Sequence, residues 1–425
     1  MCPSTKGFQK NFITTSMHIL YNIGVLLYGL AIQLAAFVNP KAKEWVNGRR
    51  NYFKNLPIID TSNLYWFHCA SLGEFDQALP VINLLKEKDP SIFIFVTFFS
   101  PSGYLHYQKR KHKVDLATYL PLDTPGNAKL FIQHFKPKKA FFVKYEFWAN
   151  YIFEAKKQNV KLYSISALFR EKQHFFKPNA KFFPSILKQF DYFFVQNQLS
   201  ANLLEKIGIN KYLISGDTRF DRVIENKSQL QPNIKIESFL NGEKAFIIGS
   251  SWPEDESILI PLLNSNKLNK KIIIAPHSVD ENHILQIIKE LKVPFIRYTQ
   301  MKEKSTIESK PNVLILDTIG QLSSAYFYGE IAYVGGGFSG SLHNILEPAV
   351  FGLPVLFGPK FTKYPEASEF LNHKIGFSIN STEAFLINYQ NITSNLSELN
   401  ASCQLFINSN KGASEKIIST IEKQN

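Results

Sequence analysis

The sequence LYWFHCASLGEFDQALPVINLLKEK, residues 64–88, contains a complete strand–turn–helix unit. The run LYWF predicts a buried strand, the small residues after it predict a turn, and DQALPVINLLKEK predicts a helix. Glu74 lies where this helix begins, at the carboxyl end of the strand, where open α/β sheets bind their ligands. The stretch therefore predicts a parallel sheet. It leaves open whether Glu74 is a catalyst or an acid that complements the helix dipole.

The same alternation of apolar strands with helical segments continues along the chain. It predicts strands at 64–69, 91–99, 116–120, 139–145, 160–166, 191–196 and 212–215, and again at 245–249, 271–275, 294–298, 312–316, 331–335 and 354–357. Between these sets, residues 221–243 are polar and lack strong periodicity. We therefore expect an α/β fold of two Rossmann-like domains, at 46–220 and 244–425. Residues 221–243 form the expected linker, and the cleft between the domains is the expected binding site.

Composition indicates a globular protein, since 45% of the 425 residues are hydrophobic and 20% are charged. The three cysteines have neither disulfide nor metal-site spacing, which favours a reducing compartment. The net charge of +13 suits a phosphorylated substrate or an anionic membrane surface. Nucleic acid is disfavoured, because no finger, basic-zipper or RNA-recognition pattern occurs.

Residues 17–38, MHILYNIGVLLYGLAIQLAAFV, contain no Lys, Arg, Asp or Glu over the length that a helix needs to cross a bilayer. We expect a membrane anchor within residues 1–45. Basic residues are more numerous after this segment than before it, which predicts that the body of the protein lies in the cytoplasm. Because Asn22 and Gln33 interrupt the apolar run, the alternatives are a helix in the membrane interface and a buried core helix.

A second carboxylate, Glu146 in the stretch KYEFWAN (144–150), follows another predicted strand of the first half. Two acids at the ends of two strands of one parallel sheet can face the same ligand. For Glu146, as for Glu74, the alternative is a first-turn acid that stabilises a helix by less than about 1 kcal/mol.

In the second half, IIGSSWPEDE (247–256) leads from a strand through Ser250 and Ser251 to an acidic helix start. These serines are candidates for ligand binding, with ordinary N-capping as the alternative. The next stretch, IIIAPHSVDEN (272–282), places His277 and Ser278 at another strand end.

The stretch IAYVGGGFSGSLHNILEPAVFGLPVLFGP, residues 331–359, predicts a phosphate or nucleotide site. Gly335–Gly337 let the backbone approach a ligand, and amides at a helix start favour phosphate, although a tight structural turn is the alternative. The pattern is neither GxGxxG nor a Walker loop. Asn344 and Glu347 share one helix face, where Glu347 can accept both hydroxyls of a ribose, whereas His343 alone is typical of an ordinary loop histidine.

Taken in order, several stretches resemble the motifs of the 3-deoxy-D-manno-octulosonic acid (Kdo) transferases. They are HCASLGE, KYEFWAN, SGDTRFD, GSSWPEDE, APHSVDE, DTIGQLSSAYFYGEIAYVGGGF and HNILEPAVFGLPVLFGP. This resemblance implies the GT-B fold and an N-terminal anchor in the inner membrane, with the catalytic body on the cytoplasmic side. It also implies inverting transfer of Kdo from CMP-Kdo to a lipid A precursor (lipid IVA) in lipopolysaccharide synthesis, without a cofactor or a catalytic metal.

The resemblance further implies roles for single residues. Glu74 matches the general base and Glu146 a second acid in the same region, with the acceptor on the first domain and the nucleotide sugar on the second. The implied substrate-binding residues are Ser71, Gly73, Asp217, Arg219, Ser250, Ser251, His277, Ser278, Gly335, Gly336, Gly337, Asn344 and Glu347. The implied partners are CMP-Kdo, a lipid A precursor and membrane lipids, and no nucleic acid.

Two motifs depart from the family pattern. Where relatives have Arg-His after a strand-end proline, this chain has His277 and Ser278, so a charged contact is missing or supplied elsewhere. Many relatives have Gly-Asn and a Lys where GDTRFD stands, and Arg219 keeps the basic character. Two rival hypotheses are another GT-B enzyme that uses a UDP sugar and a membrane-tethered nucleotide-sugar or lipid-binding protein without catalysis.

Overall fold

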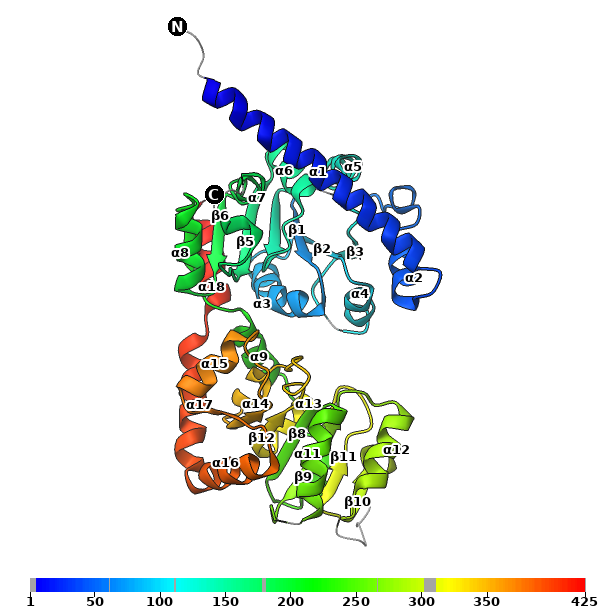
Figure 1. Ribbon diagram of the computed structural model, residues 1–425, viewed down its shortest axis with the longest axis vertical. Coiled ribbons are helices and arrows are strands. Elements are labelled where there is room, and N and C mark those ends of the chain that lie inside the picture. Colours follow the sequence, from blue (N-terminus) through cyan, green and yellow to red (C-terminus); the bar gives the residue numbers. More distant parts are fainter. Residues whose placement is uncertain are drawn as a thin grey trace. The chain divides into compact units, whose positions relative to one another are not determined.

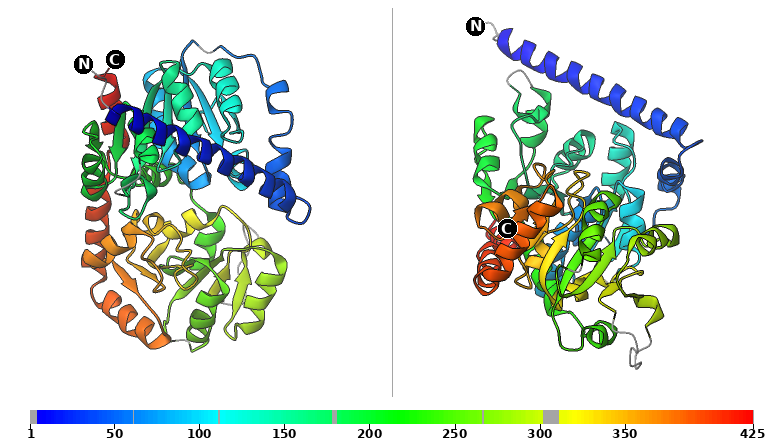
Figure 2. Two further views of the ribbon diagram at one scale, coloured as in Figure 1. Left: turned by 45° about the horizontal axis from the view of Figure 1, so that its top comes forward. Right: turned by 60° about the horizontal axis from the view of Figure 1, so that its bottom comes forward.

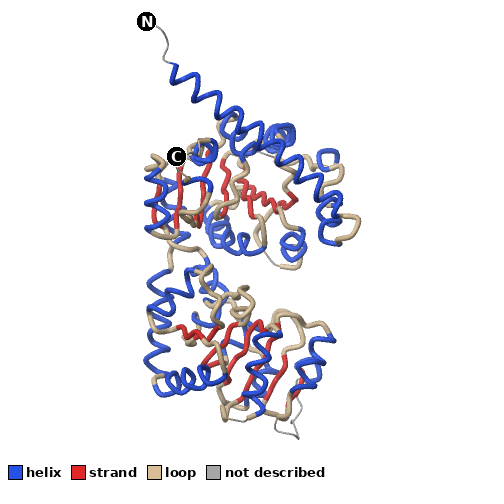
Figure 3. Tube along the Cα trace, in the orientation of Figure 1, coloured by secondary structure: helices blue, strands red, loops and turns tan. Residues whose placement is uncertain are grey.

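The chain forms two compact units in the computed structural model. The structure describes residues 5–60, 62–110, 112–177, 181–265, 267–301 and 311–424, with side chains from Ser16 onward. Unit 1 comprises Met1–Arg222 and Lys411–Asn425, and unit 2 comprises Val223–Asn410. In both units a sheet is flanked by helices (Figure 3).

The sheet of unit 1 has seven parallel strands in the order β3-β2-β1-β4-β5-β6-β7. Their bounds are β1 Leu64–Cys69, β2 Phe93–Phe98, β3 Leu116–Tyr119, β4 Lys139–Val143, β5 Lys161–Ala167, β6 Tyr192–Val195 and β7 Tyr212–Ile214. The chain winds from β1 to one edge and from β4 to the other. The strand order therefore reverses between β1 and β4, the place where doubly wound sheets bind ligands.

Helices cover both faces of this sheet. One face packs against α3 (Leu72–Lys88), α4 (Pro101–Tyr107) and α18 (Ala413–Glu422), and the other against α5 (Pro125–Phe135), α6 (Ala149–Lys157), α7 (Phe182–Leu187) and α8 (Gln198–Lys206). Side chains alternate along β1 accordingly. Trp66 joins the core with Phe131, and Phe67 joins the core with Phe75.

The sheet of unit 2 has seven parallel strands in the order β10-β11-β9-β8-β12-β13-β14. Their bounds are β8 Ala245–Ser251, β9 Lys271–Pro276, β10 Phe295–Arg297, β11 Val313–Ile315, β12 Gly329–Val334, β13 Val355–Phe357 and β14 Gly376–Ser378. Here the strand order reverses between β8 and β12. β14 was not predicted, because its three residues contain too little apolar pattern.

The helices of unit 2 are mostly short. They are α10 (Ile234–Leu240), α11 (Pro253–Asn264), α12 (Glu281–Glu290), α13 (Leu322–Phe327), α14 (Leu346–Ala349), α15 (Pro365–Asn372), α16 (Thr382–Ser394) and α17 (Leu396–Asn410), while α9 (Arg219–Ser228) begins in unit 1. The predicted linker, 221–243, is largely ordered helix. Ile236, Phe239 and Leu240 are buried in the core of unit 2, a long-range contact that the weak local pattern did not reveal.

The C-terminal helix does not belong to the domain in which we predicted it, residues 244–425. In the structure α18 belongs to unit 1 (Figure 2). Ile417, Ile418 and Ile421 are buried among side chains of α3, and Asp221 accepts hydrogen bonds from the N–H groups of Gly412 (2.6 Å) and Ser414 (2.7 Å). An amphipathic helix shows which of its faces is apolar but not which core that face joins.

The N-terminal segment forms α1 (Thr5–Ala35), α2 (Pro40–Asn47) and the 3₁₀ turn η1 (Tyr52–Lys54). Within α1, Ser16–Ala35 is long and apolar enough to cross a membrane by length and composition, with a mean hydropathy of 1.5. One side of α1 packs on unit 1 beside α6 and α7 (Figure 1). Tyr21 donates to Asp123 (2.5 Å), His18 contacts Asn150 (2.9 Å), and Asn22 accepts from Asn150 (2.9 Å). The remaining face is exposed, so α1 is not the buried core helix of the alternative hypothesis.

Candidate active site

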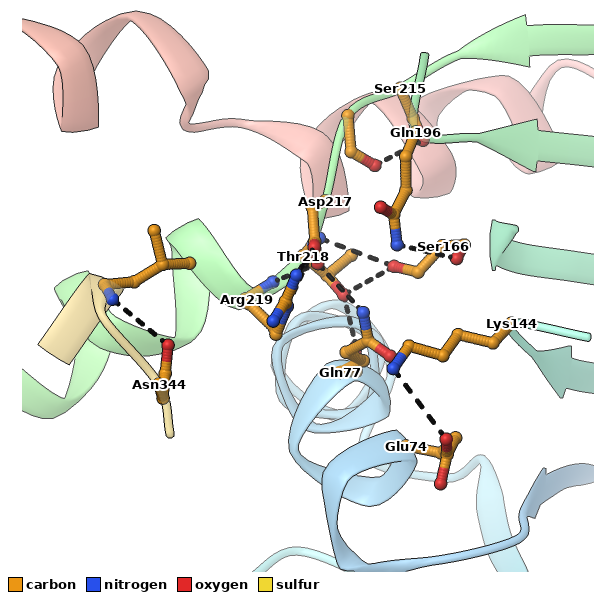
Figure 4. A network of polar contacts seen from close by, with 12 residues as sticks. Glu74, Gln77, Lys144, Ser166, Gln196, Ser215, Asp217, Thr218, Arg219 and Asn344 are labelled. Carbon is orange, nitrogen blue, oxygen red and sulfur yellow. Dashed lines mark hydrogen bonds and ion pairs between the residues drawn. The ribbon is translucent and has the colours of Figure 1, made fainter. Parts of the chain in front are cut away.

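Glu74 lies in the first turn of α3, directly after β1, and is 9% exposed. One oxygen, Oε2, accepts hydrogen bonds from the backbone N–H (2.9 Å) and the hydroxyl of Ser71. The other, Oε1, lies 3.9 Å from Nζ of Lys144, at the end of β4 (Figure 4). Glu74 therefore does cap its helix, as the alternative hypothesis proposes, but capping occupies only one oxygen and orients the other.

Glu146 lies in the loop between β4 and α6, close to this pair. Burial, and then the negative charge of Glu74, raise the pKa of Glu146 to about 7, and the charge of Lys144 opposes them. The β1 and β4 strand ends thus combine two carboxylates and one ammonium group. This group of residues can hold both a proton and a negative charge near neutral pH.

Lys144 was not predicted as a site residue, although it opens the KYEFWAN motif. Its φ of 61° lies in the left-handed region, which residues other than glycine seldom adopt. Strain of this kind persists where surrounding structure enforces it, and it often marks functional sites. A charged residue directly after the buried strand β4 was the available signal.

His68 secures the loop that carries Glu146. Its Nε2 accepts a hydrogen bond from Nε1 of Trp148 (3.0 Å), and its Nδ1 lies 3.0 Å from Oγ1 of Thr97. Burial lowers the pKa of His68 to about 3, so the ring is neutral at pH 7. With Nε2 as acceptor, the proton is on Nδ1, and the role of His68 is structural.

Asp217 forms a buried polar network with the helix that carries Glu74 (Figure 4). It accepts hydrogen bonds from Nε2 of Gln77 (2.9 Å) and Nε of Arg219 (2.8 Å). Burial acts to raise the pKa of Asp217, but the charge and hydrogen bonds of Arg219 hold it below its usual value. Thr218 donates to the carbonyl of Gln77 (2.6 Å) and lies 2.7 Å from the hydroxyl of Ser166. These contacts fix α3, and the sequence did not indicate Gln77.

Two other predicted residues lie beside Glu74. Ser71 is the N-cap of α3, and Gly73 is an exposed first-turn residue. A Cβ added to Gly73 would have ordinary contact with Oγ of Ser71 at 3.7 Å and no closer neighbour. The space beside Glu74 is therefore open at Gly73, and binding of substrate there stays a prediction.

In unit 2 an aromatic cluster lies at the carboxyl ends of β8 and β9. Trp252 stacks on His277 with ring centroids 4.1 Å apart, and His277 lies 4.7 Å from His343. Nε2 of His343 accepts a hydrogen bond from Nε1 of Trp252 (3.2 Å). Burial, and then His277, lower the pKa of His343 to about 4, so this ring is neutral and its proton is on Nδ1. The cluster borders a pocket of about 350 Å³ that Ser278 and Asn282 also line.

The glycine loop after β12 is bound to Asp255 of α11. The carboxylate of Asp255 accepts hydrogen bonds from the N–H groups of Gly336 (2.8 Å) and Trp252 (2.9 Å) and from the hydroxyl of Tyr333 (2.6 Å). The N–H of Gly335 donates to the carbonyl of Gly249 (2.9 Å). These two glycine amides are thus already paired, and they cannot donate to a phosphate without losing those bonds.

The glycines are instead needed for close packing. A Cβ on Gly335 would lie 2.2 Å from the carbonyl oxygen of Ser250, and a Cβ on Gly337 would lie 2.4 Å from the nitrogen of Gly358. Gly336 has a φ of 86°, which favours glycine. The geometry supports the structural-turn alternative for this loop, and a contact of Gly335–Gly337 with substrate stays a prediction.

The predicted serines of unit 2 have mixed roles. Neither Ser250 nor Ser251 is the N-cap of α11, which is Trp252. Ser251 donates to Glu256 (2.7 Å), and Ser278 donates to Asp280, so both hydroxyls have partners within the protein. Ser250 has a φ of 54°, a left-handed conformation at the end of β8.

Asn344 and Glu347 lie together, as their spacing predicted. Nδ2 of Asn344 donates to Oε1 of Glu347 (3.3 Å), and Oδ1 accepts from the N–H of Leu346 (3.2 Å). Glu347 lies in the four-residue helix α14. The pair offers adjacent amide and carboxylate groups, which are suited to vicinal hydroxyls.

Comparison with known proteins extends these observations. Residues 45–222 match the family model of the 3-deoxy-D-manno-octulosonic-acid transferases. A 3-deoxy-D-manno-octulosonic acid transferase of Aquifex aeolicus is 29% identical over 343 residues, which cover 79% of this chain and 87% of that protein. A bifunctional glycosyltransferase/methyltransferase of Fusobacterium nucleatum is 26% identical over 86% of this chain, but the match spans only 58% of that longer protein.

Among solved structures, the UDP-GlcNAc 2-epimerase from Neisseria meningitidis matches 85% of this chain and 99% of its own. Its TM-score is 0.59 at 17% sequence identity, so the likeness concerns the fold alone. The two doubly wound parallel sheets agree with that fold. The family model and the curated relatives thus show that this chain is similar to the Kdo transferases, and the sheet topology together with the solved structure shows the GT-B fold.

Proposed function

We propose that the protein transfers Kdo from CMP-Kdo to a lipid A precursor of the lipid IVA type, with inversion. The observation that carries this proposal is the position of Glu74. It lies at the topological switch point of unit 1, within the part of the chain that matches the family model, with one oxygen held by Ser71 and the other next to Lys144. A carboxylate so fixed is a suitable general base.

In the proposed step, a hydroxyl oxygen of the acceptor attacks the anomeric carbon of Kdo. Glu74 takes the hydroxyl proton as the new carbon–oxygen bond forms. The bond from the anomeric carbon to the phosphate oxygen of CMP breaks, and CMP leaves with that electron pair. Attack on the face opposite the leaving group inverts the anomeric configuration.

Glu146 and Lys144 set the charge around this base. Lys144 favours an ionised carboxylate nearby through its positive charge. Glu146, whose pKa is raised to about 7, holds a proton over part of the physiological range and can donate a hydrogen bond to a sugar oxygen. In this proposal Glu146 orients the acceptor, whereas Glu74 accepts the proton.

The nucleotide is assigned to unit 2. We expect the ribose at Asn344 and Glu347 and the remaining donor groups near the Trp252–His277–His343 cluster. Both histidines have lowered pKa values because of burial, so neither replaces the family arginine as a cation. The backbone N–H of Lys360 donates to the carbonyl of Gly337 (2.8 Å), which places this exposed basic residue next to the glycine loop. Lys360 is therefore the candidate replacement for the family arginine.

The location of the protein is part of the proposal. The apolar helix α1 supports attachment to the inner membrane, and the basic residues after it support a cytoplasmic catalytic body. A membrane-attached enzyme meets its lipid acceptor in two dimensions, and its net charge of +13 favours an anionic leaflet.

The test is mass spectrometry of a lipid IVA-type acceptor incubated with the full chain and a panel of donors. We expect a mass increase of one or more Kdo residues with CMP-Kdo, and none with UDP-N-acetylglucosamine or UDP-glucose. Transfer from a UDP sugar would favour the rival GT-B function, and no transfer from any donor would favour the non-catalytic binding protein. A parallel assay with EDTA tests the prediction that the reaction needs no metal, and loss of turnover on chelation would contradict it.

A further inference from the structure

A pocket of about 650 Å³ lies in unit 1 between α1, α2, η1 and the segment after β3. Among the residues that the structure describes, three basic ones line it, Arg49, Arg50 and Lys54, and no acidic residue does. Its walls include the aromatic rings of Trp45, Tyr52 and Phe53. The pocket is therefore positively charged and partly apolar. It is separate from Glu74 and Glu146 and from the residues of unit 2 at which we expect the nucleotide.

Arg49 is a half-buried cation in the wall of this pocket. Its guanidinium donates to three carbonyl oxygens, those of Leu120 (2.8 Å), Phe99 (2.7 Å) and Trp45 (3.2 Å), and stacks over the ring of Trp45 at 3.9 Å. Among the described residues, no carboxylate lies within ion-pair distance of it. Burial lowers the pKa of Arg49 to about 9, which reflects the cost of an uncompensated charge.

The pocket borders the exposed apolar face of α1. Gly29 and Gln33 of α1 line the pocket, whereas the neighbouring Leu30 and Leu34 are 53% and 61% exposed and Phe37 is 86% exposed. Nearer the start of the helix, His18, Tyr21 and Asn22 of α1 contact Asp123 and Asn150 and so hold α1 to unit 1. A helix fixed to its domain on one side and apolar on the other is suited to lie along a bilayer surface, with the pocket at the level of the lipid headgroups.

We propose that this pocket binds the headgroup of an anionic glycerophospholipid. The lipid phosphate supplies a negative charge to pair with Arg49, and Arg50 and Lys54 attract the same phosphate. The acyl chains of the lipid continue along the apolar face of α1. The ligand is a constituent of the membrane, distinct from donor and acceptor, so the site does not depend on Kdo transfer. Binding of this lipid attaches unit 1 to the bilayer surface.

The test uses the full chain in neutral detergent and native mass spectrometry with added phosphatidylglycerol or phosphatidylcholine. We expect one retained phosphatidylglycerol per chain and little phosphatidylcholine. In the variant Arg50→Gln/Lys54→Gln, phosphatidylglycerol binding should weaken by about tenfold or more, because each basic residue near a lipid surface contributes appreciably. Both residues are exposed, so the fold should persist.

The matched control is Lys161→Gln/Lys211→Gln, which removes two exposed charges, one at the start of β5 and one directly before β7, in the half of the sheet away from β3. It should bind phosphatidylglycerol like the parent. Equal binding of the two lipids, or equal loss in the variant and the control, would overturn the proposal. Displacement of the lipid by millimolar inorganic phosphate would also overturn it, since the site would then recognise free phosphate. If Arg49→Lys binds phosphatidylglycerol more tightly than Arg49→Gln does, the positive charge at this position is the cause. Melting curves of both variants check that they are folded.

Discussion

Glu74 has two carboxylate oxygens in different surroundings, one held by Ser71 and one beside Lys144. Glu74→Gln separates the two roles, because glutamine at this position retains the capping bond but cannot accept the proton. We expect kcat to fall by about a hundredfold or more, with little change in donor affinity or melting temperature. Single-turnover transfer at saturating CMP-Kdo and acceptor measures this.

Glu87→Gln is the control, since it removes an exposed carboxylate of the same helix that forms an ion pair with the surface residue Lys113 (3.0 Å). It should transfer Kdo at the parental rate. Near-parental transfer by Glu74→Gln would mean that Glu74 is a helix cap only.

Glu146 makes stability depend on pH in an unusual direction. Its pKa rises from an ordinary value of 4.5 to about 7 in the folded protein, so the folded state binds this proton more tightly than the unfolded state. The resulting stabilisation is complete below the unfolded value and is lost as the pH rises through about 7. The parent should therefore lose stability between about pH 5 and about pH 8 relative to Glu146→Gln.

Denaturant unfolding of both proteins at these two pH values measures the difference. Glu146→Gln should gain on the parent as the pH rises. A difference that stays constant with pH would show that Glu146 ionises normally and would remove its proposed role as a proton-bearing group.

At the scale of elements, the glycine loop after β12 packs so closely on neighbouring backbone that it requires glycine. In Gly337→Ala the new Cβ would meet the backbone of Gly358 at 2.4 Å, and backbone cannot move aside as a side chain can. We expect a loss of about 1–3 kcal/mol in the free energy of unfolding, by denaturant titration. Gly126→Ala is the control, because its Cβ has no neighbour within 4 Å.

If Gly337 instead contacts the nucleotide directly, Gly337→Ala would keep its stability and lose CMP affinity by calorimetry. That result would contradict the packing interpretation. Gly126→Ala should match the parent in both stability and CMP affinity. Only then can a change in Gly337→Ala be assigned to the glycine loop.

At the scale of the whole molecule, the chain crosses back from unit 2 to unit 1 through α18. Ile418→Ala should destabilise the protein by about 2–5 kcal/mol, since Ile418 is 1% exposed in the core of unit 1. Hydrogen exchange should increase in the strands of unit 1, β1 to β7, and not in those of unit 2. Faster exchange in β8 to β14 instead would show that residues 411–425 belong to the second domain.

Ile387→Ala is the control for this experiment. Ile387 lies in α16 of unit 2 and is 69% exposed, so its loss should change stability by no more than about 0.5 kcal/mol. Hydrogen exchange in both units should then match the parent.

The amino-acid sequence by itself determined the parallel α/β class, thirteen of the strands, the carboxylates at the ends of β1 and β4, and the similarity to the Kdo transferases. These features follow from local patterns. A buried strand of a parallel sheet is a short apolar run, and a site at its end is a polar residue next in the chain. The contact between Asn344 and Glu347 was predictable from their separation of only three residues, although Asn344 itself lies before the helix α14 that carries Glu347.

Only the tertiary structure decided features that join distant parts of the chain. It placed α18 in the core of unit 1, docked the polar side of α1 on Asp123 and Asn150, and paired the glycine-loop amides with Asp255. It also brought Lys144 to Glu74. Each is a contact between residues far apart in sequence, and the periodicity of a segment shows which face is apolar or polar but never which distant partner that face meets.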